Sequence, residues 1–274
     1  MAASIDFDTL FAPPDQLQDL TGKWALVSGA SAGIGKAAAC MLAAAKCNVA
    51  LLARRKDRLE ELKAEIEKRG LGVEVKIVAG DVAADETYVA LKDAGILDNT
   101  DFLINNAGLA RGKDTVDSFL LSDIKEMLDA NCYGAFRLVH EVLPGMIKRG
   151  GGHVVSTGSI AGLEAYEGGS VYCASKHALH AFMKALRYET FDKNIRCTVV
   201  APGLVGEGTE FSEVRFHGDK EKAAAVYKNV QELKSTDVAA QIVWALRQPP
   251  HVNLDMVHVM PTSQGGATRL HRSA

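Results

Sequence analysis

The stretch WALVSGASAGIG, Trp24 to Gly35, decides the fold. WALVS is an apolar run typical of a buried strand, and it leads directly into a loop with glycines at Gly29, Gly33 and Gly35 before an alanine-rich helical pattern. Glycine lets the backbone turn sharply and approach a ligand, while the free amides and positive dipole of a helix N-terminus attract anions. Such glycines can serve the turn alone, but their place between strand and helix favours a site for a dinucleotide diphosphate. We expect this site to comprise Gly29, Ser31, Ala32, Gly33, Ile34 and Gly35.

Short β-rich apolar runs alternate with longer segments of helical period along the rest of the chain, without an internal repeat. This alternation predicts one α/β domain, a Rossmann-type doubly wound parallel sheet of about seven strands with helices on both faces. The predicted strands are Trp24–Ser28, Asn48–Ala53, Val73–Ala79, Asp101–Ile104, Gly152–Ser156, Ile195–Ala201 and Met256–Met260. The predicted helices are Gly33–Lys46, Asp57–Arg69, Asp85–Ala94, Asp123–Arg149, Val171–Asp192 and Ser235–Arg247.

Two segments fall outside this alternation. Residues 1–20 are acidic and lack both the apolar core of a signal peptide and the arginines of a transit peptide, so we expect an N-terminal extension before a domain over 21–274. The run Thr209–Asn229 has no strand pattern, and we expect one or two short helices above the sheet. A long insertion there is typical of a substrate loop, which we place near 204–229.

Composition limits the partners and the compartment. The chain has 274 residues, a net charge of -3 and no apolar run of membrane-spanning length, so we expect neither nucleic acid nor membrane as a partner, but a small molecule. Its five cysteines are odd in number, irregularly spaced and without a Cys-x-x-Cys pair, which favours reduced thiols in the cytoplasm over disulfides or zinc. His177 and His180 have no third ligand at a useful spacing, so we expect no metal site.

The second predicted strand ends at the position that would meet the adenine ribose of a nicotinamide cofactor. An acidic residue there accepts hydrogen bonds from a ribose 2′-hydroxyl, whereas arginine accommodates a 2′-phosphate. Ala53 stands at the acidic position, and Arg54 and Arg55 follow it. A solvated basic start to a helix is the alternative, but two arginines without a carboxylate favour NADP(H).

Tyr172 and Lys176 lie about one helical turn apart in GGSVYCASKHALHAF, Gly168 to Phe182, so both side chains project from one helix face. A positive charge next to a phenol favours the phenolate, so we expect Lys176 to lower the pKa of Tyr172. A tyrosine tuned in this way can transfer protons near neutral pH.

The chain resembles the short-chain dehydrogenase/reductase family. The matching segments occur in the family's order from Lys23 to about Thr262, and Ser28 departs from a more common threonine. They are SGASAGIG, NNAG at Asn105–Gly108, Asn131, GSIAG from Gly158, the Tyr172 and Lys176 pair, and Pro202–Gly203.

The resemblance implies four catalytic residues: Asn131, Ser159, Tyr172 and Lys176. Tyr172 would be the general acid for carbonyl reduction or the base for alcohol oxidation, Lys176 would also hold the nicotinamide ribose, and Ser159 would bind the substrate oxygen. Asn131 would maintain a water link to solvent. Further implied cofactor-binding residues are Asp81, Val82, Asn106, Pro202, Gly203, Val205 and Thr209.

A finer resemblance, in TEFSEVRFHGDKEKAAAVYKN and the arginine pair, is to NADP-dependent dehydrogenases of 3-hydroxy acids such as serine, L-allo-threonine and 3-hydroxypropionate. A substrate carboxylate needs a cation, and Arg215 is our candidate, with Arg111 also available. The alternatives are a broad carbonyl, steroid or ketoacyl reductase, and a non-catalytic NADP(H)-binding regulatory protein. The family resemblance also implies a homo-oligomer, with a tetramer expected, and the apolar-poor tail SQGGATRLHRSA is expected to lie across a neighbour.

Overall fold

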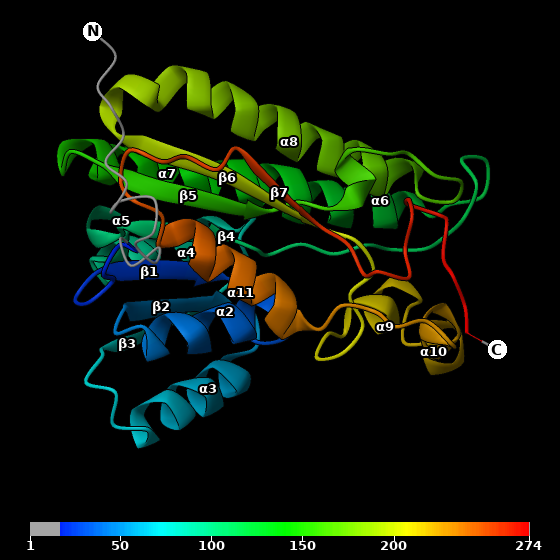
Figure 1. The fold of residues 1–274 in the computed structure, drawn as a ribbon, viewed down its shortest axis with the longest axis horizontal. Helices are drawn as coiled ribbons and strands as arrows, with labels where there is room; N and C mark the ends of the chain where they lie inside the picture. The colour runs from blue at the N-terminus through cyan, green and yellow to red at the C-terminus, as the bar shows by residue number, and fades with distance from the viewer. Residues whose placement is uncertain (1–16, 274) are drawn as a thin grey trace, which may run out of the picture.

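The computed structural model describes residues 17–273 and contains one seven-stranded parallel sheet in the order β3-β2-β1-β4-β5-β6-β7 (Figure 1). The predicted extension over 1–20 lies outside the described residues up to residue 16. The remainder packs on the domain, where Leu20 is buried and Arg196 donates to Gln18. The strands are β1 Trp24–Ser28, β2 Asn48–Ala53, β3 Val75–Ala79, β4 Phe102–Asn105, β5 Gly152–Thr157, β6 Ile195–Pro202 and β7 Met256–Val259.

Helices cover both faces of the sheet because the central strands are apolar on both faces. In β1, Ala25 and Val27 join the core on one face and Leu26 joins the core on the other. The first face carries α2 Gly33–Ala44, α3 Lys56–Lys68 and α11 Ser235–Leu246. The second carries α4 Asp85–Asp93, α5 Ile96–Asn99, α7 Ala135–Lys148 and α8 Ser170–Thr190. The prediction of a single doubly wound parallel sheet is confirmed.

The predicted helix Asp123–Arg149 is not one α-helix. It divides into α6 Leu121–Leu128, a π-helical segment η1 Asp129–Gly134, and α7. The apolar period continues across all three, so the sequence pattern hides the change in hydrogen bonding. Single π-helical turns inside α-helices often occur at functional sites, and this one carries Asn131.

The segment over 204–229, predicted to be a substrate loop and called by that name below, forms two short helices, α9 Phe211–Arg215 and α10 Lys220–Tyr227 (Figure 1). Short 3-10 helices also follow β5 and α8, as η2 Ile160–Gly162 and η3 Phe191–Lys193. The C-terminal segment returns to the loop, where Ser273 N donates to Asn229 O over 2.9 Å. No helix in the described part of the chain is long and apolar enough to cross a membrane.

The strand order places a crevice at β1. The chain runs outward from β1 through β2 to β3 and then returns to β4 on the other side of β1. Loops leave such a point in opposite directions, and open α/β sheets bind ligands there, at the carboxyl ends of the strands. The glycine loop after β1 lies at this point.

Candidate active site

A cavity of about 760 Å³ lies at the carboxyl ends of the strands. It is lined by the glycine loop, the ends of β2, β4, β5 and β6, the substrate loop and the C-terminal segment. Of the predicted site residues, all but Gly35 and Asn131 line it. The predicted residues that line the cavity are Gly29, Ser31, Ala32, Gly33, Ile34, Arg54, Arg55, Asp81, Val82, Asn106, Ser159, Tyr172, Lys176, Pro202, Gly203, Val205, Thr209 and Arg215.

The glycine loop is shaped for close approach. Gly29 and Gly33 have φ of 67° and 58°, a backbone conformation that glycine adopts without strain. Gly35 has a different role, because a Cβ there would lie 2.4 Å from Gly29 O and prevent α2 from packing on the loop. The Ala32 side chain cannot cap α2, and no acidic residue occupies the first turn. The amides at the start of α2 are therefore available to an anion.

Ser28 and Asn106 join the glycine loop to the end of β4. The Ser28 hydroxyl accepts hydrogen bonds from the backbone amides of Asn106 and Ala107, at 2.9 and 3.0 Å. The Asn106 amide nitrogen donates to Ser28 O, and its side-chain oxygen accepts from Thr157 on β5. Three strand ends are held in register by these polar groups, so the floor of the cavity is preorganised.

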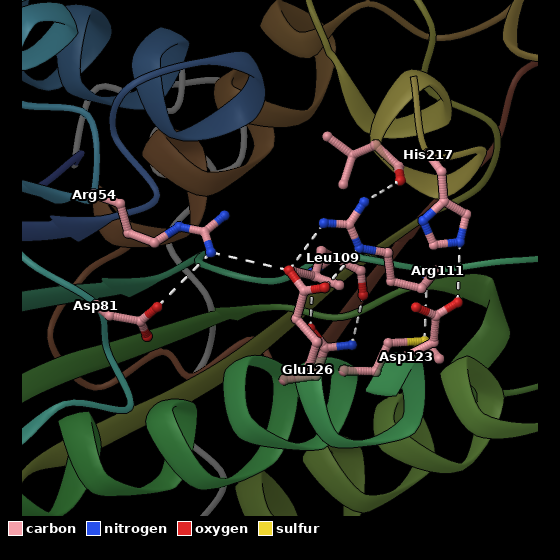
Figure 2. A network of polar contacts seen from close by, with 10 residues as sticks. Arg54, Asp81, Leu109, Arg111, Asp123, Glu126 and His217 are labelled. Carbon is pink, nitrogen blue, oxygen red and sulfur yellow. Dashed lines mark hydrogen bonds and ion pairs between the residues drawn. The ribbon is translucent and has the colours of Figure 1, made fainter. Parts of the chain in front are cut away.

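Arg54 and Arg55 directly follow β2, line the cavity and contact different partners. Arg55 Nη2 donates to the Ser31 hydroxyl at 3.0 Å, and its Nη1 lies 2.7 Å from a carboxylate oxygen of Glu210. Arg54 Nη1 lies 3.8 Å from Asp81 Oδ2 and 4.0 Å from Glu126 Oε1 (Figure 2). The Arg55 guanidinium and the Ser31 hydroxyl therefore lie together where a phosphate monoester can bind, and Arg54 lines the same cavity.

Tyr172 and Lys176 lie on the first turns of α8 and are both buried. Lys176 Nζ donates to Thr157 O at 2.8 Å and lies 5.9 Å from the centre of the Tyr172 ring. The Ser159 hydroxyl caps η2 by accepting from Ala161 N, and it faces the Tyr172 phenol. Phe211 of the substrate loop packs against the Tyr172 ring in a tilted arrangement, with ring centres 5.6 Å apart.

Burial, rather than the charge of Lys176, dominates the pKa of Tyr172 in this structure. Burial raises the pKa of Tyr172 and outweighs the opposing effects of Ser159 and Arg215. Burial also lowers the pKa of Lys176 to about 8. The Lys176 ammonium is engaged with Thr157 O, so Tyr172 is a neutral phenol at neutral pH, the form that can donate a proton.

Asn131 lies behind the cavity wall. Its side chain exchanges two hydrogen bonds of 2.8 Å with the backbone of Leu109 and donates a third to Ser175. A Cβ on Gly108 would lie 2.8 Å from its oxygen, so the contact needs glycine at that position. These bonds connect the π-helical segment, the loop after β4 and α8, and Asn131 holds α8 in place.

Arg215, the candidate for binding a substrate carboxylate, lies in the cavity wall. Its guanidinium donates to Gly112 O at 2.9 Å, to the Tyr166 hydroxyl at 3.1 Å and to Gly168 O at 3.4 Å. All three acceptors are neutral, so the positive charge has no carboxylate among these partners. Arg215 lines the same cavity as Tyr172, and its charge acts to lower the pKa of that phenol against the larger effect of burial.

Arg111, the other cation considered for a substrate carboxylate, does not serve that role. It forms a two-pronged ion pair with Glu126 and donates to Val214 O, and it does not line the cavity (Figure 2). On the same side, His217 lies 3.0 Å from Asp123. These contacts attach the substrate loop to α6.

Several cavity residues were not anticipated from the sequence. The C-terminal segment lines the cavity of its own chain, where Ala267 N donates to Glu164 at 2.8 Å, and its contact with a neighbour stays a prediction. Hydrogen bonds such as that from Ala267 hold the segment in place although it has few apolar residues, and no short-range sequence pattern predicts them. The unanticipated residues include Tyr166, Glu210, Phe211, Tyr227, Gln264, Ala267, Thr268, Leu270 and Arg272.

The histidine pair on α8 is part of the packing. His177 Nδ1 contacts Cys173 O at 2.9 Å, and the His180 ring fills the space beside Gly158 and Gly162. Within residues 17–273, no group of three or more His, Cys, Asp or Glu side chains is placed to hold a metal ion.

Comparison with known proteins agrees with this arrangement. The family model described as short chain dehydrogenase matches residues 23–240. The chain is 43% identical over 256 residues to the NADP-dependent 3-hydroxy acid dehydrogenase of Schizosaccharomyces pombe. The matched residues cover 92% of this chain and 98% of that protein. It is 39% identical over 251 residues to the NADP-dependent 3-hydroxy acid dehydrogenase YdfG of Escherichia coli K12, over 90% of this chain and 98% of that one.

Two solved structures are also similar. A closed form of serine dehydrogenase complexed with NADP+ has a TM-score of 0.84 and 36% identity, over 91% of this chain and all of that chain (100%). Serine dehydrogenase from Escherichia coli has a TM-score of 0.73 and 32% identity, over 88% of this chain and 99% of that chain.

Proposed function

The chain belongs to the short-chain dehydrogenase family, and we propose that it transfers a hydride between NADP(H) and a small 3-hydroxy acid such as serine, L-allo-threonine or 3-hydroxypropionate. That it is an NADP-dependent dehydrogenase follows from the family and from the relatives. The choice of substrate class rests on one observation, the Arg215 guanidinium in the cavity wall near Tyr172.

The residues present fit NADP(H). The amides at the start of α2 suit its diphosphate, and Ser31, Arg54 and Arg55 suit the 2′-phosphate. Asp81 and Val82 border the adenine position, whereas Asn106 and Lys176 suit the ribose on the nicotinamide side. When bound, the cofactor supplies or accepts the hydride.

The chain's own residues handle the proton. The neutral Tyr172 phenol donates it to the carbonyl oxygen in reduction, and oxidation runs the same transfer in reverse. Ser159 donates a hydrogen bond to the same substrate oxygen, and Lys176 provides positive charge below the phenol. Asn131 positions α8 through Leu109 and Ser175.

Arg215 gives the substrate preference. A guanidinium can bind a carboxylate through two parallel hydrogen bonds, and its present acceptors, Gly112 O and Gly168 O, are neutral and weaker. A substrate held at Arg215 by its carboxylate would present its hydroxyl to Tyr172 and Ser159. A wholly apolar substrate such as a steroid would leave this charge without an anion, which disfavours the broad reductase. The complete Asn131, Ser159, Tyr172 and Lys176 set disfavours a regulatory protein without turnover.

Steady-state kinetics of Arg215→Ala test the substrate class. We expect the KM for serine or 3-hydroxypropionate to rise about tenfold or more, since one charged hydrogen bond is worth roughly 1.5–3 kcal/mol. Activity towards an uncharged alcohol of similar size should change little. Arg215→Lys keeps the positive charge but cannot form two parallel hydrogen bonds, so its KM for the acid should lie between those of wild type and Arg215→Ala.

The uncharged alcohol is the control for damage to the loop, because general loosening would reduce activity on both substrates equally. Equal losses, or wild-type kinetics on the acid, would remove Arg215 from the substrate site. The broad carbonyl reductase would then be the better description.

We also propose a cytoplasmic homotetramer. Large apolar side chains are exposed on α6 and at the end of α8, among them Leu120, Leu121, Tyr188 and Phe191, and assembly would cover them. Light scattering at micromolar concentration should give four times the chain mass of 29.3 kDa. A mass equal to one chain would reject assembly.

A further inference from the structure

Glu210 belongs to the substrate loop but binds the arginines at the far end of the cofactor site. Its Oε2 lies 2.7 Å from Arg55 Nη1, and its Oε1 lies 2.9 Å from Arg58 Nη1. One carboxylate therefore bridges two guanidinium groups, one at the end of β2 and one on α3. Glu210 also lines the cavity, so the bridge lies at the edge of the ligand site rather than behind its wall.

Together with Ser31, the bridge engages all three nitrogens of the Arg55 guanidinium. Its Nε and Nη2 both donate to the Ser31 hydroxyl, at 3.3 and 3.0 Å, while Nη1 is directed at Glu210. A 2′-phosphate at this position would compete for the Arg55 and Arg58 donors that Glu210 now occupies. Carboxylate and phosphate both bind a guanidinium fork through paired oxygens, so the two anions suit the same donors.

The charges favour exchange rather than coexistence. Burial acts to raise the pKa of Glu210, but the hydrogen bonds and charges of Arg55 and Arg58 outweigh it and hold the pKa below its ordinary value. Glu210 is therefore an anion at neutral pH. A phosphate monoester carries about -1.5 to -2 charges at pH 7, so an unmoved Glu210 would repel it.

We propose that Glu210 is a specificity-determining residue that competes with the 2′-phosphate of NADP(H) for Arg55 and Arg58. The competition lowers the affinity for NADP(H) and leaves NAD(H), which has no 2′-phosphate, unaffected. Because Glu210 directly precedes α9, the same exchange releases the substrate loop from β2 and α3 when the phosphate arrives. This inference rests on the proposed phosphate site at Arg54 and Arg55.

Coenzyme binding to Glu210→Gln tests the competition without requiring turnover. Dissociation constants for NADPH and NADH are measured by nucleotide fluorescence, with thermal melting to verify folding. We expect NADPH to bind roughly two- to tenfold more tightly, the range for partly exposed ion pairs, and NADH to bind as in wild type. Glu207→Gln is the matched control, since Glu207 lies on the same loop, pairs with Lys234 at 2.8 Å and does not line the cavity.

Salt dependence gives a second readout. Salt weakens the phosphate contacts in both proteins, but in wild type it also weakens the competing Glu210 pairs. NADPH affinity should therefore fall more steeply with salt in Glu210→Gln than in wild type. If NADPH affinity falls equally steeply with salt in the two proteins, Glu210 does not compete with the phosphate.

Arg55→Gln separates failure of this inference from failure of the phosphate site. If it leaves NADPH affinity unchanged, the phosphate is held elsewhere and both proposals fail. If it weakens NADPH while Glu210→Gln leaves NADPH unchanged or weakens it, the phosphate site stands. Glu210 would then orient Arg55 instead of competing for it, and the inference is overturned.

Discussion

Arg111 and Glu126 form a two-pronged ion pair, with Nε 2.7 Å from Oε2 and Nη2 3.0 Å from Oε1. The pair joins the segment after β4 to α6. Arg111 Nη1 also donates to Val214 O at 2.7 Å, and Arg54 Nη1 lies 4.0 Å from Glu126 (Figure 2). One carboxylate thereby connects the cofactor end of the cavity to the substrate loop.

Replacing Arg111 with Met should destabilise the protein at neutral pH by about 1 kcal/mol, because Glu126 loses both donors while partly buried. Thermal melting should fall by about 2–4 °C. The Arg111 hydrogen bonds hold the pKa of Glu126 below its ordinary value, so this contribution is complete above the unfolded-state pKa of about 4.3. It is lost as pH falls through the lower folded-state pKa, so the two melting curves should converge below pH ~4.

Arg69→Met is the control for Arg111→Met. Arg69 forms an exposed pair with Glu65 at 2.9 Å on α3, and such pairs contribute little. If the two substitutions lower the melting temperature equally, or if the Arg111→Met protein still melts below wild type in acid, the Arg111–Glu126 ion pair does not make the proposed contribution to stability.

Tyr172→Phe should abolish turnover and leave NADPH binding nearly unchanged, since only the transferable proton is lost. Single-turnover reduction and nucleotide fluorescence measure the two effects separately. Tyr188→Phe is the matched control, because Tyr188 lies on the same helix with 69% of its surface exposed. A Tyr172→Phe variant with a tenth of wild-type activity would remove the phenol from its proposed role.

The strands were predicted to within two residues because each is an apolar run bounded by turn residues. Burial of β1 and β2 follows directly from WALVS and NVALLA. The cavity position also followed, since glycines after the first strand of a doubly wound sheet lie at its switch point.

The remaining features depend on long-range contacts that local pattern does not encode. Glu210 meets Arg55 across 155 residues of chain, and Ala267 meets Glu164 across 103. The pKa of Tyr172 depends on complete burial, which the spacing of Tyr172 and Lys176 does not reveal. The π-helical turn at Asn131 is hidden because α6 and α7 continue the same apolar period.

Combining Ala53→Asp with Arg54→Gln should move coenzyme preference from NADP towards NAD. Ala53 ends β2 and lines the cavity, so an added carboxylate can accept from a ribose 2′-hydroxyl and repel a 2′-phosphate. Losing one charged hydrogen bond costs roughly 1.5–3 kcal/mol, so NADPH should bind about ten- to a hundredfold more weakly. Fluorescence titration of both coenzymes measures the change, and unchanged selectivity would mean that the phosphate is held elsewhere.

Lys176→Met should abolish cofactor-dependent activity and weaken NADPH binding, yet raise the melting temperature at pH 7. Burial lowers the pKa of Lys176 from 10.5 to about 8, so the folded protein carries an unfavourable charge at neutral pH. Methionine removes this charge at similar size, against the loss of one hydrogen bond to Thr157 O. Stability given up for a functional charge is common in active sites.

The pH dependence identifies the cause of this gain. Between the folded-state pKa of about 8 and the ordinary 10.5, the unfolded chain binds more protons at Lys176 than the folded chain does. Wild-type stability at this residue therefore rises with pH across that window, and the advantage of Lys176→Met should shrink there and vanish above it. Lys184→Met, on the exposed side of the same helix, should give no gain at pH 7 because Lys184 pairs with Asp255 at 2.6 Å. A lower melting temperature for Lys176→Met at pH 7, or a gain that is constant up to pH 10.5, would show that the Lys176 ammonium is well accommodated and that its burial is not opposed by desolvation.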